Sequence, residues 1–267
     1  MKTQIITHNG KAHLDDFLAS AVLAAWVVEN GGEPEITRKQ WPSSEDLTNP
    51  EVWVLDFGKE HNPALKNFDH HQISGGEQCA FTLLLEYLGM RDYDAMPWIS
   101  FVEKWDNCGP TVAMASLGGG NSALIYSPVE DFALKKFSAF EGVIEDLSEI
   151  IELGKFILGG YKNYISTTEE LKKVTIQKIN RFNVADYREI PGDFPLNFPA
   201  ADKFEKENDV DIVYTINTRG TMPFRMIRKK DHIDFNKAAG LDGVDFIHQN
   251  GFLICFSCDY RLIFEKL

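Results

Sequence analysis

Histidine and aspartate residues gather in two short segments of the N-terminal part of the chain. Four of the seven histidines lie in THNGKAHLDD (residues 7–16) and FDHHQ (residues 68–72). Imidazole nitrogens and carboxylate oxygens together suit divalent transition metals, and a carboxylate can bridge two ions. The pattern therefore predicts a metal site. The candidate residues in these segments are His8, His13, Asp15, Asp16, Asp69, His70 and His71.

Two further aspartates lie at the ends of expected elements, Asp56 after the strand segment VWVL and Asp106 after the helix segment FVEKW. Each candidate alone has an ordinary structural interpretation, such as Asp15 as a helix N-cap or Asp56 as a turn residue. The combination is more specific, because H-x₄-H-x-D, an aspartate after a strand and D-H-H follow one another in this order. We therefore expect a dinuclear Mn²⁺, Fe²⁺ or Zn²⁺ centre with open positions for water.

The segments around these residues predict alternating strands and helices. Residues 4–7 and 52–58 are apolar runs of strand length, and FLASAVLAAWVVEN has helical spacing with aspartates as its expected N-cap. Further helices are expected at 79–89 and 97–106. This order is typical of an α/β domain with a largely parallel sheet, in which ligands bind at the carboxyl ends of the strands. His8 and Asp56 are expected at that edge.

The rest of the chain predicts a connector and a smaller C-terminal domain. Residues 117–131 are expected to form a loop, and the helical pattern after it breaks near Gly159-Gly160. From Val174 onward the pattern indicates strands, with a short helix near 199–206. We therefore expect three parts, which are a metal-binding catalytic domain over 1–128, a helical connector over 129–173 and a substrate-binding α+β domain over 174–267.

Composition limits the class of protein. A formal net charge of −13 argues against binding of long duplex DNA and suits a protein that attracts divalent cations. No apolar run has the length of a membrane span, and the first residues do not resemble a signal peptide, so we expect a cytoplasmic protein that does not bind membranes. Cys255 and Cys258 form a C-x-x-C without a second pair, and we expect them to be core residues of a strand.

Four segments together carry a family resemblance. THNGKAHLDDFLA, VLDFG, FDHHQ and KWDNCG resemble, in this order, the four motifs of the DHH phosphoesterase superfamily. Within it, the chain most resembles the melanocyte-proliferating-gene group of metal-dependent hydrolases and exonucleases, although Asp16 stands where that group has Glu. The resemblance implies hydrolysis of phosphodiester bonds in nucleotides or short oligonucleotides. It also implies two divalent ions, foremost Mn²⁺, with Co²⁺, Fe²⁺, Zn²⁺ or Mg²⁺ as alternatives.

The resemblance also implies a role for each residue of the site. His71 would contact the scissile phosphate and Asp69 would orient a ligand imidazole, and Asp16 is grouped with these two as a catalytic residue. One metal ion would be bound by His8, His13 and Asp56. The second would be bound by Asp15, Asp56, His70 and Asp106, with Asp56 as the bridge.

A second resemblance lies near the C-terminus, where PFRMIRKKDHIDFNKAAGLDGVDFIHQNGFLICF resembles the DHH-associated substrate domain. That family has consecutive glycines where this chain has GVDFIHQNG. A solvated basic strand end and an ordinary turn stay open as alternatives. The substrate-binding residues implied by this resemblance are Arg225, Arg228, His248, Asn250 and Gly251.

Several functions remain open at this point. Short oligonucleotides fit the resemblance best, followed by dinucleotides and then by pyrophosphate or polyphosphate. A non-catalytic module that binds metal and nucleotide is the alternative from another class. The oligomeric state, with a homodimer as one alternative, is also open.

Overall fold

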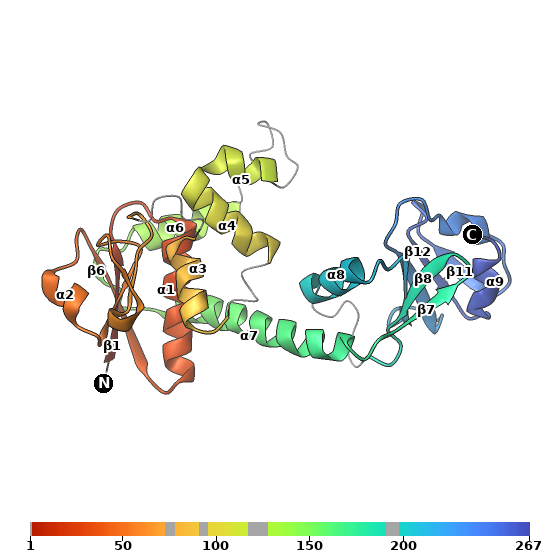
Figure 1. Cartoon of the computed structure of the whole chain (residues 1–267), viewed down its shortest axis with the longest axis horizontal. Coiled ribbons are helices and arrows are strands. Elements are labelled where there is room, and N and C mark those ends of the chain that lie inside the picture. The colour runs from red at the N-terminus through yellow and green to blue at the C-terminus, as the bar shows by residue number, and fades with distance from the viewer. Residues whose placement is uncertain (1, 73–77, 91–95, 117–127, 191–197) are drawn as a thin grey trace. The chain divides into compact units, whose positions relative to one another are not determined.

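The chain divides into two units in the computed structural model, Met1–Tyr161 and Lys162–Leu267. The structure describes residues 2–72, 78–90, 96–116, 128–190 and 198–267 (Figure 1). Each unit is built around its own sheet and is described by itself.

The first unit contains a six-stranded sheet in the order β4-β5-β3-β1-β2-β6. Strand β1 is parallel to β2 and β3, and β3 is parallel to β5. The edge strands β4 and β6 are antiparallel to their neighbours. The predicted α/β domain with a mostly parallel sheet is confirmed. The strands are β1 (Lys2–His8), β2 (Glu33–Lys39), β3 (Val52–Leu55), β4 (His61–Asn62), β5 (Asn67–Phe68) and β6 (Gly142–Val143).

Helix α1 (Leu14–Glu29) is the centre of the first unit and contacts β1, α3 and α4 (Figure 1). Its buried residues, which include every alanine of the helix, lie on almost every side, which explains why its sequence has little polar face. Helix α7 passes so close to α1 that a Cβ atom on Gly154 would lie 1.9 Å from the carbonyl oxygen of Ala21. The other described helices that begin in this unit are α2 (Ser44–Thr48), α3 (Ala80–Tyr87), α4 (Pro97–Cys108), α5 (Pro110–Ser116), α6 (Pro128–Ser138) and α7 (Ser148–Leu171), with a 3₁₀ turn at Pro63–Leu65. The last turns of α7 belong to the second unit.

Some boundaries differ from the sequence expectations. The N-cap of α1 is His13, so Asp15 and Asp16 lie inside the first turn and are not caps. Residues 128–131 are helical, and the rest of the expected loop, 117–127, lies outside the described residues. Helix α7 continues through Gly159-Gly160, and the helical pattern breaks instead between α6 and α7. Ile157, Leu158 and Tyr164, which lie on either side of these glycines, are buried, and their packing offsets the roughly 1 kcal/mol cost of a glycine inside a helix.

The second unit contains a six-stranded sheet in the order β11-β12-β10-β9-β8-β7. Its core includes Phe235, Phe256 and Ile254, which are fully buried. Cys255 and Cys258 are free thiols and are only partly buried. The expectation that both are core residues is therefore wrong. The elements are β7 (Thr175–Ile179), β8 (Phe182–Asp186), α8 (Phe198–Glu207), β9 (Ile212–Ile216), β10 (Phe224–Arg228), a 3₁₀ turn at Phe235–Ala238, β11 (Val244–Ile247), β12 (Leu253–Phe256) and α9 (Tyr260–Phe264).

None of the helices in the described part of the chain has both the length and the apolar composition of a membrane span.

Candidate metal centre

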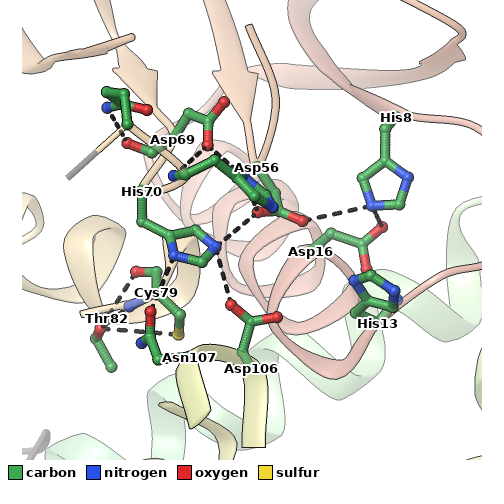
Figure 2. A network of polar contacts seen from close by, with 12 residues as sticks. His8, His13, Asp16, Asp56, Asp69, His70, Cys79, Thr82, Asp106 and Asn107 are labelled. Atoms are coloured by element: carbon green, nitrogen blue, oxygen red, sulfur yellow. Dashed lines mark hydrogen bonds and ion pairs between the residues drawn. The ribbon is translucent and has the colours of Figure 1, made fainter. Parts of the chain in front are cut away.

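The carboxyl ends of β1 and β3 place the first two candidate ligands side by side. Thr7 and Leu55 are register partners of these parallel strands, and His8 and Asp56 are the next residues along the chain. The Nε2 atom of His8 lies 3.4 Å from Oδ2 of Asp56 (Figure 2). The positive φ of Asp56 marks the sharp turn that ends β3 at this point. The placement expected for both residues is observed.

Strand β5 brings the D-H-H segment to the same edge. Leu55 and Phe68 are register partners, so Asp56 and Asp69 each follow a paired residue. The Nε2 atom of His70 lies 3.3 Å from Oδ1 of Asp56. The metal-binding imidazole candidates therefore lie on both sides of the Asp56 carboxylate, as Figure 2 shows.

Helices α1 and α4 contribute the remaining carboxylates. His13, as the N-cap of α1, donates its backbone N–H to Oδ1 of Asp16 at 2.7 Å. This capping contact fixes the first turn, from which Asp15 enters the interior with no exposed surface. Asp106 comes from the last turns of α4, and its Oδ2 atom lies 2.8 Å from Nε2 of His70.

The candidate ligands form three overlapping groups whose ligand atoms lie within 4.8 Å of one another. Asp56 and His13 each belong to two groups, and of these two residues the Asp56 carboxylate can bridge two ions. The group of His8, His13 and Asp56 is the set expected for one ion, whereas the residues expected for the second ion are divided among the groups. The structure thus brings together all six residues for which a metal-ligand role was expected. The groups are His8, His13 and Asp56; Asp56, His70 and His71; and His13, Asp15 and Asp106.

Hydrogen bonds fix the imidazoles of His8 and His70 with Nε2 directed at the carboxylates. The carbonyl oxygen of Asn9 can only accept, so the Nδ1–H group of His8 donates to it at 2.9 Å. The amide nitrogen of Asn107 donates to the Glu103 carbonyl, which turns its Oδ1 atom toward Nδ1 of His70 at 3.1 Å. In the neutral form, each Nε2 atom then carries a lone pair, as a metal ligand requires.

Asp15 provides the test of whether these residues fit a cation. Both of its carboxylate oxygens are buried, and neither has a hydrogen-bond partner among the described residues. A buried carboxylate without a donor or a cation is costly, so native proteins rarely keep one. Burial and the neighbouring carboxylates of Asp56 and Asp106 raise the pKa of Asp15 well above its usual range. A divalent cation would remove both penalties, and the residues therefore fit a metal centre.

Without a metal ion, the histidines take the place of the cation. Burial lowers the pKa of His70, but the carboxylates of Asp106 and Asp56 outweigh burial and raise it to about 10. In the same way, burial lowers the pKa of His8, and Asp56 and Asp16 raise it to about 9. Burial raises the pKa of Asp56, but its contacts with His70 and His8 hold it at about 2. Metal ions and protons therefore compete for this site.

Asp69 holds His71 rather than a predicted metal ligand. Its Oδ1 atom accepts the backbone N–H of His71 at 3.0 Å and lies 2.7 Å from Nδ1 of the same residue. Its Oδ2 atom accepts the backbone N–H of Lys59 at 2.6 Å. The side chain of His71 is 52% exposed, so its ring is held by Asp69 and remains accessible to solvent. The partner of His70 is Asn107, which the sequence reasoning did not identify.

Arg38 is the second residue that the sequence reasoning missed. It lies in β2, is 2% exposed, and donates hydrogen bonds to the carbonyl oxygens of His8, Gly10 and Phe137. Its guanidinium lies 3.9 Å from Oδ2 of Asp16. Arg38 thereby holds the loop that connects β1 to α1. Asn107 could have been found as the neighbour of Asp106 in KWDNCG, whereas nothing in the sequence near Arg38 signals its role.

The residues expected to bind substrate lie in the second unit. Arg225 and Arg228 are in β10, and Arg225 is 9% exposed and opposite Cys255 of β12. His248, Asn250 and Gly251 form the turn between β11 and β12, where the backbone N–H of Asn250 donates to Nδ1 of His248. Gly251 has a positive φ, and a Cβ atom there would lie 1.8 Å from Oδ1 of Asp234. A tight turn is thus sufficient to explain this glycine.

Two pockets adjoin the centre and share His13. A pocket of about 290 Å³ lies against His8, Asp56 and His71, and we call it the β-edge pocket. A pocket of about 750 Å³ lies against Asp15 and Asp106, and we call it the α4 pocket. The centre is therefore open to ligands from two directions.

The N-terminal third of the chain resembles a known protein family. Residues 4–81 match the MYG1_exonuc family, which is described as an uncharacterised protein family (UPF0160). MYG1 exonuclease of Mus musculus is 39% identical over 69 residues, which are 26% of this chain and 17% of that protein. The chain thus matches less than a fifth of the length of this relative. The residues that the family model matches include His8, Asp56 and His70, and they end before Asp106.

Two solved structures are distantly similar to the chain. The pGpG-specific phosphodiesterase PggH from Vibrio cholerae aligns with 99% of this chain and 96% of its own, at a TM-score of 0.33 and 13% identity. RecJ from Thermus thermophilus in complex with Mg²⁺ aligns with 98% of this chain and 48% of its own, at a TM-score of 0.30 and 12% identity.

Proposed function

We propose that the chain is a divalent-metal-dependent phosphoric ester hydrolase that cleaves phosphodiester bonds of nucleotides or short oligonucleotides. Two metal ions, foremost Mn²⁺, would be its cofactors. The observation that carries the proposal is the buried Asp15 carboxylate, which has no donor among the described residues and forms one ligand group with His13 and Asp106. The partial match to the MYG1_exonuc family supports the same type of chemistry.

The protein residues would bind the proposed metal ions and orient their ligands. When bound, divalent ions lower the pKa of coordinated water and offset the charge of a phosphate group. His8, His13 and Asp56 would hold one ion, and Asp15, His70 and Asp106 would hold the other together with Asp56. Asn9 and Asn107 keep the imidazoles of His8 and His70 turned toward the carboxylates. The protein thus supplies a preorganised set of ligands, which lowers the cost of reorganisation during the reaction.

His71 would act on the phosphate group itself. Its Nδ1 atom contacts Asp69, and its half-exposed side chain lines the β-edge pocket. A hydrogen bond from this imidazole would stabilise negative charge on a non-bridging phosphate oxygen. Asp69 fixes the orientation of the ring, and Asp16 acts through the His13 backbone and so supports the ligand loop.

The net charge of −13 favours short substrates over long duplexes, because binding of a duplex depends on the release of many counterions by basic residues. Inorganic pyrophosphate and polyphosphate stay the alternative substrates. A non-catalytic module that binds metal and nucleotide is the alternative to an enzyme.

Metal-dependent turnover tests the proposal. The protein is treated with a chelator, reloaded with Mn²⁺, and incubated with a 5′-phosphorylated dinucleotide, a short single-stranded RNA and pyrophosphate. We expect hydrolysis of the two nucleotide substrates, none with the chelator, and loss of bound Mn²⁺ together with a loss of activity of about 100-fold or more in Asp56→Asn. The matched control is Asp245→Asn, an exposed aspartate of β11.

Other results would favour other functions. Hydrolysis of pyrophosphate alone would make the chain a pyrophosphatase. Nucleotide binding that survives Asp56→Asn, with no turnover by the wild type under Mn²⁺, Co²⁺ or Mg²⁺, would make it a binding module and overturn the proposal.

A further inference from the structure

Each of the two pockets beside the metal centre contains aromatic and basic side chains. The β-edge pocket is lined by Trp41, Phe57 and Lys59 in addition to the candidate ligands. The α4 pocket is lined by Phe101, Trp105 and Lys11. The catalytic residues named above do not explain these side chains, because none of them is needed to hold a metal ion.

Trp105 and Phe101 form an open aromatic surface on α4. They are one helical turn apart, their ring centroids are 5.4 Å apart, and both are only partly buried. An aromatic pair with this spacing is ordinarily a core contact, but here both rings line a pocket. Asp15 and Asp106 line the same pocket, so this surface lies beside the candidate metal centre.

Trp41 is the corresponding residue of the β-edge pocket. It follows β2 and is 59% exposed, whereas Trp53 in the same sheet is 3% exposed and stacks on Phe68. Lys59 lies at the same pocket, where its backbone is fixed by the hydrogen bond to Asp69. A large aromatic face that stays exposed beside a candidate catalytic centre is typical of ligand contact.

Together these surfaces match the two ends of a phosphodiester. Bases stack on aromatic side chains with little regard to their identity, and nearby lysines neutralise the flanking phosphates. We propose that the chain binds a substrate with a nucleobase on each side of the scissile phosphate, with one base stacked on Trp41 and the other on Trp105 and Phe101. This inference rests on the proposed phosphodiesterase function and specifies its substrate as a dinucleotide unit.

The proposal gives the two tryptophans separate partners. With the scissile phosphate at the centre, the base on the 5′ side and the base on the 3′ side would lie in different pockets. Removal of one base should therefore cancel the effect of replacing one tryptophan and leave the effect of the other. Pyrophosphate, which has no base, would gain nothing from either residue.

The experiment compares Trp41→Ala and Trp105→Ala on three substrates. These are a 5′-phosphorylated adenine dinucleotide and its two analogues in which an abasic spacer replaces one nucleoside. We expect each variant to raise KM for the dinucleotide about tenfold with little change in kcat, because stacking contributes to binding of the base. Each replacement should leave KM for one abasic analogue unchanged, because that analogue lacks the base that the replaced tryptophan would stack on. The unaffected analogue should be a different one for each of the two variants.

Matched variants separate stacking from folding. Trp105→Phe and Trp41→Phe should keep most of the affinity, and Trp98→Ala tests another exposed tryptophan of α4 that is not among the residues lining either pocket. Bound Mn²⁺ should be unchanged in all of them. An equal rise in KM on all three substrates, or none on the dinucleotide, would overturn the proposal.

A binding measurement covers the case in which no substrate is turned over. The affinity of the fluorescently labelled dinucleotide is then measured by anisotropy with Mn²⁺ present. Weaker binding of the dinucleotide by Trp41→Ala and Trp105→Ala, each with the selectivity for one abasic analogue, would support the base sites while the proposed hydrolysis fails. Equal binding by all variants, or no binding at all, would overturn the base sites.

Discussion

His70 and Asp106 meet at the centre of the site, with Nε2 of the histidine 2.8 Å from Oδ2 of the aspartate. One residue follows β5 and the other lies in α4, so this contact joins the sheet edge to the helical part of the first unit. In the absence of metal it is an ion pair, because the pKa of His70 is raised to about 10. A bound cation would replace this pair with two ligand bonds.

Replacement of Asp106 by Ala should reduce Mn²⁺ binding and lower kcat by about 100-fold or more, because the carboxylate is lost from both its ion pair and its ligand group. Metal content of the purified variant and turnover of the dinucleotide measure the two effects. Full Mn²⁺ content with normal kcat would show that Asp106 is not a ligand. Asp202→Ala, an exposed aspartate that pairs with Lys206 on α8, is the control.

Replacement of Asn107 by Ala should weaken Mn²⁺ binding by about 10- to 100-fold, because the Nδ1–H group of His70 loses the acceptor that fixes its orientation. Titration of the metal-free protein with Mn²⁺ measures the effect. Asn107→Asp keeps an acceptor at the same place and should retain most of the affinity. Equal affinities in the Ala variant and the wild type would contradict this role for Asn107.

The metal-free protein should lose stability as the pH rises from about 6.5 to about 10. His8 and His70 have folded-state pKa values raised to about 9 and about 10, so their contribution is complete below the unfolded value near 6.5 and disappears above the folded values. Asp16 acts in the same direction at lower pH, because burial raises its pKa to about 7. Thermal unfolding in the presence of a chelator measures this trend.

Mn²⁺ should reverse the trend, because the metal-bound site holds unprotonated ligands and gains affinity as protons leave. Calorimetric titrations in buffers of different ionisation enthalpy should show proton release at neutral pH. A metal-free protein whose melting temperature stays constant from pH 6.5 to 10 would contradict the raised pKa values.

Two glycines of α7 give opposite predictions for the same substitution. Gly154→Ala should destabilise the protein by about 1–3 kcal/mol or more, because the added Cβ atom meets the Ala21 carbonyl at 1.9 Å. Gly159→Ala meets nothing within 4 Å and should stabilise the helix by up to about 1 kcal/mol. Urea denaturation measures both. Since α1 also carries Asp15, Gly154→Ala should weaken Mn²⁺ binding, whereas Gly159→Ala should not.

The sequence predicted the ligand types and the edge of the sheet where they meet. His8 and Asp56 could be placed because each follows an apolar strand and parallel strands end together. The N-cap of α1 could not be predicted. His13 shares that role with Asp16, and the aspartates that precede the apolar run lie inside the helix. Arg38 also escaped prediction, since its three carbonyl partners come from two segments that only the tertiary structure brings together.

The roles of Asp69 and Asn107 were the least predictable part of the site. Both lie next to candidate ligands in the sequence, and either could have oriented His70. The choice depends on the directions of side chains, which spacing does not give. The structure pairs Asp69 with His71 and Asn107 with His70.

The candidate ligands come from separate segments, at the ends of β1 and β3, after β5, and in α1 and α4. A bound ion would therefore act as a cross-link between distant parts of the folded chain, and its binding free energy would add to the stability of the folded state. Metal loss should lower the stability of the whole first unit and not only that of the sheet edge at the candidate metal centre. A fragment that ended with the family match at residue 81 would lack α4, and with it Asp106 and the partner of His70.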